Sequence, residues 1–309
     1  MLRNAIGPGR KQMQEYLGKI EPDVIHSHDT YGLTVKGMAV PRVFTIHGFI
    51  YGDVMVSGRR FASLHSKIWR RIETSGWADQ PHIISISPYV RERLRGIATG
   101  VIHDIDNPVS EKFFNINRKE RQGTIFSAAA ITPRKNTMAL VDAVGELAAN
   151  GLDVGLRLAG SLDDERYVQQ IRDRIQQKGL ERHVLLLGRL DTKQIQEELS
   201  SAGVFALTSL EENSPMGIEE AMAAGVPVVT SNRCGMPYMV RDGESGFLVD
   251  PNNPDDIARR LAQLLNDDEL RRSMGTKGKE IALDRFAPAK VAARTREVYL
   301  HAIGDFQQK

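Results

Sequence analysis

Residues 210–229 of the chain read LEENSPMGIEEAMAAGVPVV, and this stretch indicates the fold more clearly than any other. An apolar run, Val204–Thr208, precedes it, and a second one, Val226–Thr230, follows its glycine. Between the runs, Glu212 and Glu220 lie at either end of a turn with proline and glycine that leads into a helix. In an open α/β sheet, ligands bind past the carboxyl end of a strand and at a helix N-terminus. We therefore expect a binding site at this turn.

Apolar runs of the same kind recur through the second part of the chain. Runs of five to seven apolar residues without polar alternation are typical of strands that helices cover on both faces. Thr132-Pro133 and Asn253-Pro254 each provide a capping residue before a proline at the first helical position. The pattern predicts a parallel, doubly wound α/β sheet. Its expected strands are Gly123–Ala129, Val154–Gly160, Val184–Gly188, Val204–Thr208 and Val226–Thr230.

The first part of the chain shows the same alternation with fewer units, and a polar linker at Asn115–Gln122 follows it. The expected strands are Asp23–His28, Arg42–His47, His82–Ser87 and Val101–Asp104. The expected helices are Gly9–Lys19, Tyr31–Met38, Arg59–Trp77 and Pro88–Arg95, and a last helical segment, Pro288–Ile303, follows the final β-α unit.

Length and charge set limits on the class of protein. A chain of 309 residues suggests roughly two domains. The net charge is +2, with 15 Lys/Arg and 11 Asp/Glu in residues 1–117, which is too mild for a nucleic-acid partner. The single cysteine, Cys234, excludes an internal disulfide and fits a reducing compartment. No apolar run approaches the roughly 20 residues of a membrane span. We expect a cytoplasmic protein.

The two glutamates have a chemical use if a helix begins near Met216 and Gly217. Its free N–H groups could hold a diphosphate. Glu220 could then accept both hydroxyls of a ribose, and Glu212 could reach a sugar beyond the phosphates. The alternative is that both are solvated acids that stabilise the helix dipole. The surrounding Pro215, Gly217 and AMAAGVP segment favours the binding site.

These motifs resemble the signature of retaining nucleotide-sugar glycosyltransferases of the sucrose-synthase-like family (family 4, GT-B fold). Residues 129–136, AAITPRKN, are similar to the family's Gly-Arg-Leu…Lys-Gly loop, whose arginine and lysine neutralise the donor diphosphate. Lys135 matches the lysine, whereas Ala130 stands at the arginine position and Asn136 at the glycine. A lone lysine would more often be a solvated helix-start residue. Arg134 could compensate for the lost arginine.

The resemblance extends to both sides of these loops. Residues 235–249 are similar to the family's Gly-x-Pro-Glu-x-Val segment and the hairpin after it, with Tyr238 in place of the usual glutamate. Residues 23–28, DVIHSH, and residues 45–48, TIHG, resemble two strand ends of the family's first domain. His47 matches the histidine that approaches the donor sugar from that domain.

Six of the eight histidines lie in residues 1–117, which raises the alternative of a metal site. His26 and His28 would share one strand face and could chelate an ion. Only Asp29 offers a carboxylate at a suitable spacing. We therefore expect no metal.

The segment Arg59–Trp77 allows two interpretations. It combines an apolar stripe at helical spacing with basic residues beside it, namely Phe61, Leu64, Ile68 and Ile72 with Arg60, Lys67, Arg70 and Arg71. The favoured interpretation packs the stripe on the sheet and leaves the basic residues solvated. The alternative is contact with an anionic membrane surface or an acceptor.

We therefore expect two Rossmann-like doubly wound domains that face each other across a cleft, the GT-B arrangement. The first, 1–117, would be incomplete, because relatives begin with a strand, a Gly-Gly loop and two further β-α units before the segment that residues 23–28 match. A C-terminal helix, 285–309, would complete it. The second domain, 118–284, would bind the nucleotide sugar.

By resemblance, the chain transfers a hexose from a UDP- or GDP-linked sugar to a sugar or glycolipid acceptor, with retention and without metal or other cofactor, in polysaccharide or glycoconjugate biosynthesis. The expected catalytic residues are Glu212, Lys135 and His47, and the expected donor-binding residues are Glu220, Arg134, Ser214, Pro215, Met216 and Gly217. The alternative is a catalytically weak or inactive nucleotide-sugar-binding subunit, or a truncated fragment that acts through a partner. A protein partner that completes the first domain and a peripheral contact at the inner membrane face are both compatible with these expectations.

Overall fold

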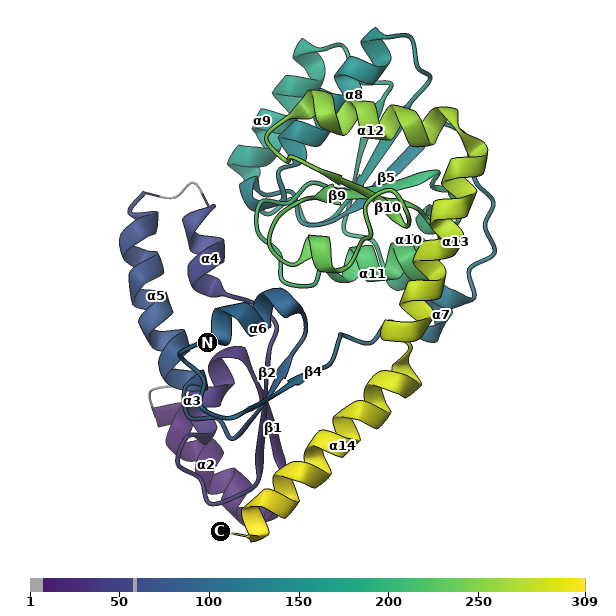
Figure 1. Cartoon of the computed structure of the whole chain (residues 1–309). Helices are drawn as coiled ribbons and strands as arrows, with labels where there is room; N and C mark the ends of the chain where they lie inside the picture. The colour runs from purple at the N-terminus through teal and green to yellow at the C-terminus, as the bar shows by residue number, and fades with distance from the viewer. Residues whose placement is uncertain (1–7, 58–59, 309) are drawn as a thin grey trace. The chain divides into compact units, whose positions relative to one another are not determined.

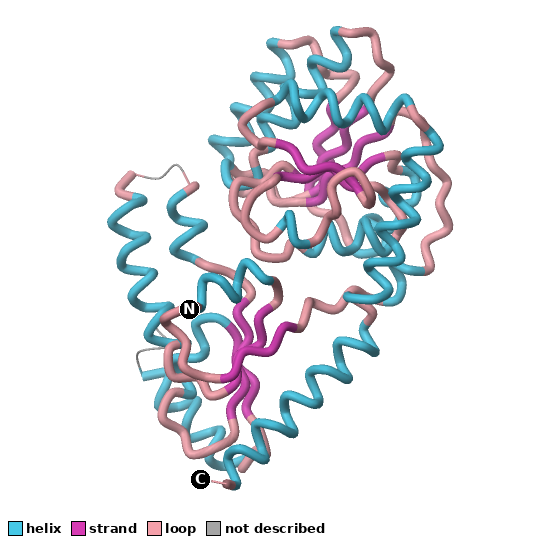
Figure 2. Tube along the Cα trace, viewed as in Figure 1, coloured by secondary structure: helices cyan, strands magenta, loops and turns pink. Residues whose placement is uncertain are grey.

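The computed structural model describes residues 8–57 and 60–308, which form two compact units (Figure 1). The first unit comprises Met1–Asn107 with Ala289–Lys309, and the second comprises Pro108–Pro288. Each unit has one parallel sheet in its interior and helices outside it (Figure 2). The expectation of two α/β domains with parallel sheets is confirmed. The segment 108–117 lies with the second unit, where the Val109 N–H donates to the Phe286 carbonyl at 2.9 Å.

The sheet of the first unit has four parallel strands in the order β1-β2-β3-β4. They are β1 (Ile25–His28), β2 (Arg42–Ile46), β3 (His82–Ser85) and β4 (Val101–Asp104). The helices are α2 (Pro8–Ile20), α3 (Gly32–Val35), α4 (Ile50–Met55), α5 (Ala62–Trp77), α6 (Pro88–Leu94) and α14 (Pro288–Gln307), with a 3₁₀ turn η1 (Asp29–Tyr31).

Successive strand residues of the first unit face opposite sides of its sheet, and each side has its own core. Phe44 and Ile83 pack with Trp77 of α5 and with α6. Val43 and Ile84 are the sequence neighbours of Phe44 and Ile83, and on the other side of the sheet they pack with Val291 and Val298 of α14. The C-terminal helix therefore completes the core of the first unit.

The sheet of the second unit has six parallel strands in the order β10-β9-β8-β5-β6-β7. They are β5 (Thr124–Ala128), β6 (Gly155–Ala159), β7 (Val184–Gly188), β8 (Val204–Leu207), β9 (Val228–Ser231) and β10 (Gly246–Val249). The helices are α7 (Glu111–Phe114), α8 (Thr137–Ala149), α9 (Glu165–Gln177), α10 (Thr192–Ser201), α11 (Met216–Ala223), α12 (Pro254–Asn266) and α13 (Asp268–Arg285), with 3₁₀ turns η2 (Pro133–Lys135) and η3 (Met236–Tyr238). The chain runs outward from β5 to β7 and then returns to β8 on the other side of β5, so the strand order reverses between β5 and β8.

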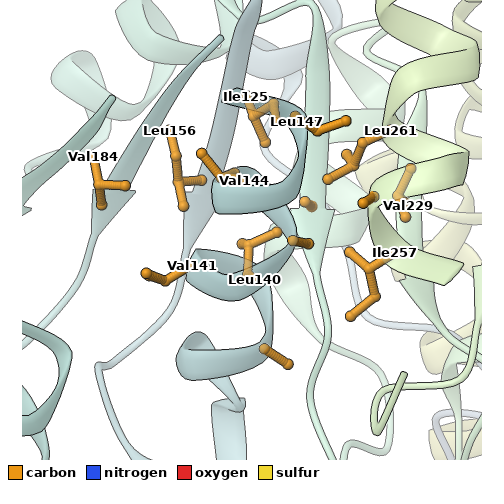
Figure 3. Close-up of a cluster of buried hydrophobic side chains, with 14 of the residues drawn as sticks. Ile125, Leu140, Val141, Val144, Leu147, Leu156, Val184, Val229, Ile257 and Leu261 are labelled. Atoms are coloured by element: carbon orange, nitrogen blue, oxygen red, sulfur yellow. The ribbon is translucent and has the colours of Figure 1, made fainter. Parts of the chain in front are cut away.

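Two apolar cores hold the second sheet between layers of helices. On one face, Ile125 of β5 and Val229 of β9 pack with Leu140 of α8 and with Ile257 and Leu261 of α12 (Figure 3). On the other face, a second cluster joins α7, α10, α11 and α13 to the sheet. Because both faces are covered, the strands carry continuous apolar runs, as the sequence indicates.

Two local expectations were wrong. Thr132 makes no side-chain capping bond and precedes the 3₁₀ turn η2, while α8 begins only at Thr137, after Asn136 in the left-handed region (φ 56°). Helices α4 and α7 were not anticipated, since both are single short turns. Asn253 and Ser87, in contrast, do cap α12 and α6 through the N–H groups of Asp256 and Val90.

The favoured interpretation of the Arg59–Trp77 stripe was correct for its basic residues, which are exposed, but wrong for three of its four apolar residues, of which only Ile72 is half-buried. Helix α5 buries Ser66, Gly76 and Trp77, whereas Phe61, Leu64 and Ile68 are exposed. The side of α5 that packs on the unit thus carries Trp77 and the small residues Ser66 and Gly76, and most of the apolar stripe is turned outward.

Over residues 8–57 and 60–308, no helix has both the length and the apolar character required to cross a bilayer.

Candidate functional site

The expected site residues of the second unit lie at the point where its strand order reverses. Lys135 follows β5, and Glu212 follows β8, and these strands are hydrogen-bonded neighbours. The chain leaves β5 toward β6 on one side and leaves β8 toward β9 on the other side. The loops after β5 and β8 therefore run apart at the carboxyl ends of these strands, and open α/β sheets bind ligands between such loops. The topology thus brings together residues 77 positions apart in the sequence.

An ion cluster is the centre of this site. The Lys135 ammonium donates to Glu212 Oε1, and Arg134 Nη1 lies 3.3 Å from Glu212 Oε2. The same Arg134 nitrogen donates to the Glu211 carbonyl at 2.9 Å. Glu212 is only 9% exposed, so its charge is held by two cations in a setting with little water. Arg134, whose direction the sequence left open, is part of this cluster.

Backbone bonds fix the loop that carries Glu212. The Leu210 N–H donates to the Arg134 carbonyl, and the Gly235 N–H donates to the Glu212 carbonyl, both at 2.8 Å. A Cβ atom at Gly235 would lie 1.7 Å from the Asn213 carbonyl oxygen, so only glycine permits this approach. The loop is therefore held from both sides, by the β5 loop and by residues after β9.

Asn136 connects three loops of the site edge. Its side-chain amide donates to the carbonyls of Thr208, at 3.2 Å, and Pro251, at 2.6 Å. Its left-handed backbone explains why it can occupy a position where the family usually has glycine, because asparagine adopts this region more readily than other side chains. Lys135, one residue earlier, is thereby held in place.

Helix α11 begins beside the ion cluster. Its N-cap is Pro215, which offers no side-chain cap, and Gly217 lies close to the Ala128 carbonyl at the end of β5. Ser214 donates from Oγ to Glu219 Oε1 at 2.6 Å, which anchors the loop to the buried first turn of the helix. The amino end of α11, Met216 included, can therefore interact with an anion through its N–H groups.

Glu220 lies in the second turn of α11 and is half-buried. Burial raises the pKa of its carboxyl to about 7. Carboxyl groups whose pKa is raised by desolvation are common among the functional residues of ligand-binding sites. Glu220 lies on the helix that follows the Glu212 loop, and its role toward a ribose stays a prediction.

His47 lies in the first unit, directly after β2. Asp29 fixes its loop, because Asp29 Oδ1 accepts from the His47 N–H at 2.8 Å and from the Gly48 N–H at 3.4 Å. The ring nitrogen His47 Nε2 lies 3.0 Å from His28 Nδ1. Burial, followed by the nearby His47, lowers the pKa of His28.

The proposed chelation by His26 and His28 does not agree with their contacts. His26 uses Nδ1 for the Tyr299 hydroxyl and Nε2 for the Thr45 hydroxyl, both at 2.7 Å. Burial lowers the pKa of His26 to about 4, so the ring is neutral and serves as a buried link to α14. In the part of the chain that the structure describes, no three His, Cys, Asp or Glu side chains are placed to bind a metal ion.

Several residues that support the site were not identified from the sequence. Asp29 was considered only as a metal ligand, and Asn136 only as a departure from a glycine. Cys234 has a left-handed backbone (φ 55°), and its Sγ lies 3.0 Å from Glu211 Oε2, next to the Glu212 loop. Such contacts depend on loop conformation, and the only signal in the sequence is an adjacent Cys-Gly pair.

A model of the family described as "Glycosyl transferases group 1" matches residues 109–281, and a model described as "Glycosyltransferase Family 4" matches residues 3–112. The first match covers more than half of the 309 residues. The chain belongs to the group 1 glycosyltransferases. Its reaction class is therefore glycosyl transfer.

Individual relatives agree with this family. The MMP alpha-(1->4)-mannosyltransferase of Mycolicibacterium hassiacum is 27% identical over 303 residues, 91% of this chain and 71% of the relative. Sucrose-phosphate synthase from Thermosynechococcus elongatus has a TM-score of 0.85 at 20% identity, over 96% of this chain and 78% of that one. HepE of Anabaena, in complex with UDP-glucose, has a TM-score of 0.78 at 18% identity, over 96% and 82%. The two structures establish the GT-B fold.

Proposed function

We propose that the chain transfers a hexose from a nucleoside-diphosphate sugar to an acceptor hydroxyl with retention of the anomeric configuration. The observation that carries this proposal is the Lys135–Glu212 ion pair at the reversal of strand order, next to the amino end of α11. A diphosphate requires cations and N–H donors together, whereas sugar hydroxyls require carboxylates. This edge of the second unit offers both kinds of group.

Each site residue has a role in the proposed complex. Lys135, Arg134 and the N–H groups at Met216 and Gly217 neutralise the diphosphate, with Ser214 and Pro215 shaping the loop. Glu220 accepts the ribose hydroxyls. Glu212 accepts hydroxyls of the hexose, and the family resemblance alone assigns His47 a role toward the hexose.

The proposed step balances without a metal or other cofactor. The acceptor oxygen forms a bond to the anomeric carbon while the bond from that carbon to the phosphate oxygen breaks. The leaving diphosphate takes the acceptor proton on the same face of the sugar, which gives a glycoside and a nucleoside diphosphate. Lys135 and the end of α11 stabilise the negative charge that develops on the leaving group.

The donor is proposed to be a UDP- or GDP-linked hexose. The fold neighbour HepE was solved with UDP-glucose, and the 27% identical relative is named a mannosyltransferase. A thermal-shift panel of UDP-, GDP- and ADP-sugars tests donor binding. A ligand at 100 times its Kd should stabilise the protein by about 2.7 kcal/mol.

The variants Lys135→Ala and Glu220→Ala should lose this stabilisation. Lys193→Ala is the matched control, since Lys193 lies on the exposed face of α10 and, among the residues that the structure describes, forms an ion pair only with Glu197, at 3.9 Å. If no nucleotide sugar raises the melting temperature, donor binding by this edge is refuted.

Ala130 supports a second candidate, a nucleotide-sugar-binding subunit with weak or no catalysis. A family arginine is replaced there, and Arg134, whose Nη1 donates to the Glu211 carbonyl, is engaged with the loop. Binding of a donor without release of the nucleoside diphosphate would favour this candidate over the enzyme.

A further inference from the structure

Helix α5 presents a row of large apolar side chains to solvent. Phe61 at its N-cap is 62% exposed, Leu64 is 57% exposed and Ile68 is 51% exposed. Leu64 and Ile68, four residues apart, lie on one side of the helix, and Phe61 directly precedes its first turn with a left-handed backbone (φ 63°). We call this row the α5 face. A single exposed leucine is common, whereas a continuous apolar row on a surface helix indicates an interaction site.

Basic side chains flank the α5 face along one side. At 100° per residue, Arg71 and Lys67 lie next to Leu64 on one side of the helix, and Arg70 lies further on. Arg60 precedes the helix, and its guanidinium lies 4.9 Å from the centre of the Phe61 ring. All four are exposed. The segment 50–77 holds five Lys/Arg and two Asp/Glu. The exposed side of α5 is therefore both apolar and cationic.

The single acidic residue of α5 does not neutralise this charge. Glu73 is turned inward, and its carboxylate accepts the N–H groups of Ile50 at 2.9 Å and Tyr51 at 3.0 Å. These donors begin α4, which packs against α5. Glu73 thus fixes α4 to α5 and leaves the outer side of the helix without an acid of its own.

We propose that the α5 face docks on the interface of an anionic lipid bilayer, with the helix lying in the plane of the membrane. Leu64, Ile68 and Phe61 enter the boundary between headgroups and acyl chains. The long basic side chains beside them reach the lipid phosphates, as lysine and arginine do at membrane interfaces. Figure 1 shows α5 and α4 on the outer side of the first unit, on the face of the sheet opposite α14.

Charge complementarity favours a membrane over a second copy of the chain. Two other helices of this unit expose large apolar side chains, namely α2 with Met13, Tyr16 and Ile20, and α14 with Leu300 and Phe306. Helix α2 carries three Lys/Arg and one Glu, and α14 carries three Lys/Arg and two Asp/Glu, so both are cationic as well. Pairing α5 with itself, with α2 or with α14 would bring like charges together, which is unfavourable. An anionic bilayer matches both the charge and the apolar row.

Vesicle flotation of the full chain tests this proposal. We expect the protein to float with vesicles of phosphatidylcholine and phosphatidylglycerol at 7:3, and to stay behind with vesicles of phosphatidylcholine alone. Binding should weaken as salt rises from about 50 mM to about 500 mM, because the Debye length shortens.

Two double variants separate the two contributions. Arg70→Gln with Arg71→Gln should lower the partition coefficient by roughly 30-fold at low salt, and Leu64→Ser with Ile68→Ser should lower it at least about tenfold. The control is Leu283→Ser with Arg166→Gln, which removes one exposed leucine and one exposed arginine from the second unit and should leave binding unchanged. Circular dichroism and the melting temperature verify that every variant is folded.

Three results would overturn the proposal. They are equal flotation with neutral and anionic vesicles, flotation with neither, or an unchanged partition coefficient in the two α5 variants. A concentration-dependent dimer of the wild type that Leu64→Ser with Ile68→Ser converts to monomer would assign the α5 face to a second copy instead.

Discussion

Glu212 and Glu220 belong to one short motif, yet their surroundings differ. Glu212 is paired with Lys135 and lies 3.3 Å from Arg134, whereas burial alone raises the pKa of Glu220 to about 7. The Glu212 carboxylate therefore already has two cationic neighbours. The second changes its charge near neutral pH, so donor binding through Glu220 should be sensitive to pH in this range.

Glu220→Gln should change how stability depends on pH. The folded-state pKa is raised above the unfolded value, so the unfolded chain loses this proton first, and the free energy of unfolding falls as pH rises from about 4.5 to about 7. The variant should equal wild type near pH 4 and exceed it at pH 8 by about 3 kcal/mol. Urea unfolding at both values measures this. Glu280→Gln, an exposed acid, is the control, and a wild-type pH profile in Glu220→Gln would contradict the account.

Gly235→Ala should disturb the Glu212 loop by steric contact alone. Gly235 has a φ of −81°, which alanine adopts easily, but its Cβ would meet the Asn213 carbonyl at 1.7 Å. We expect a loss of about 1–3 kcal/mol in unfolding free energy and weaker donor binding in the thermal-shift assay. Gly304→Ala has open space around its Cβ and serves as the control. A donor shift equal to that of wild type would show that the loop tolerates the change.

At the scale of elements, the sequence predicted most strands well and loop contacts poorly. Strands β5 and β8 form where apolar runs are continuous, because burial on both faces leaves a pattern that is local in the sequence. The contact of Arg134 with the Glu211 carbonyl depends on two loops far apart in the chain. Helix α5 shows a related limit, since its periodicity identifies an apolar face but not what covers that face.

Helix α4 illustrates an element whose position depends on one side chain. Glu73 on α5 accepts the first two N–H groups of α4, although burial raises the pKa of this carboxyl to about 7. Glu73→Ala leaves those donors without their acceptor, which should cost about 1–3 kcal/mol and increase amide exchange in residues 50–55. Hydrogen-exchange mass spectrometry measures this, with Glu15→Ala on α2 as the exposed control. Unchanged exchange would contradict the capping role.

At the scale of the whole molecule, the proposed function assigns a role to residues of each unit. The second unit supplies Lys135, Glu212 and the amino end of α11, and the first supplies His47 in a loop fixed by Asp29. His47→Ala should therefore leave binding of the free nucleoside diphosphate unchanged while it lowers turnover. Lys135→Ala should weaken both. The family was identifiable from the motifs, whereas Asp29 required the folded loop.

Release of nucleoside diphosphate from the sugar donor that gives the largest thermal shift tests the central claim most directly. The wild type should release it catalytically, Lys193→Ala should match wild type, and Lys135→Ala should be slower by at least about 100-fold, as when one oxyanion donor is removed. No release by a wild type that binds the donor, or equal rates in wild type and Lys135→Ala, would contradict the claim that this chain transfers glycosyl groups through the Lys135–Glu212 site.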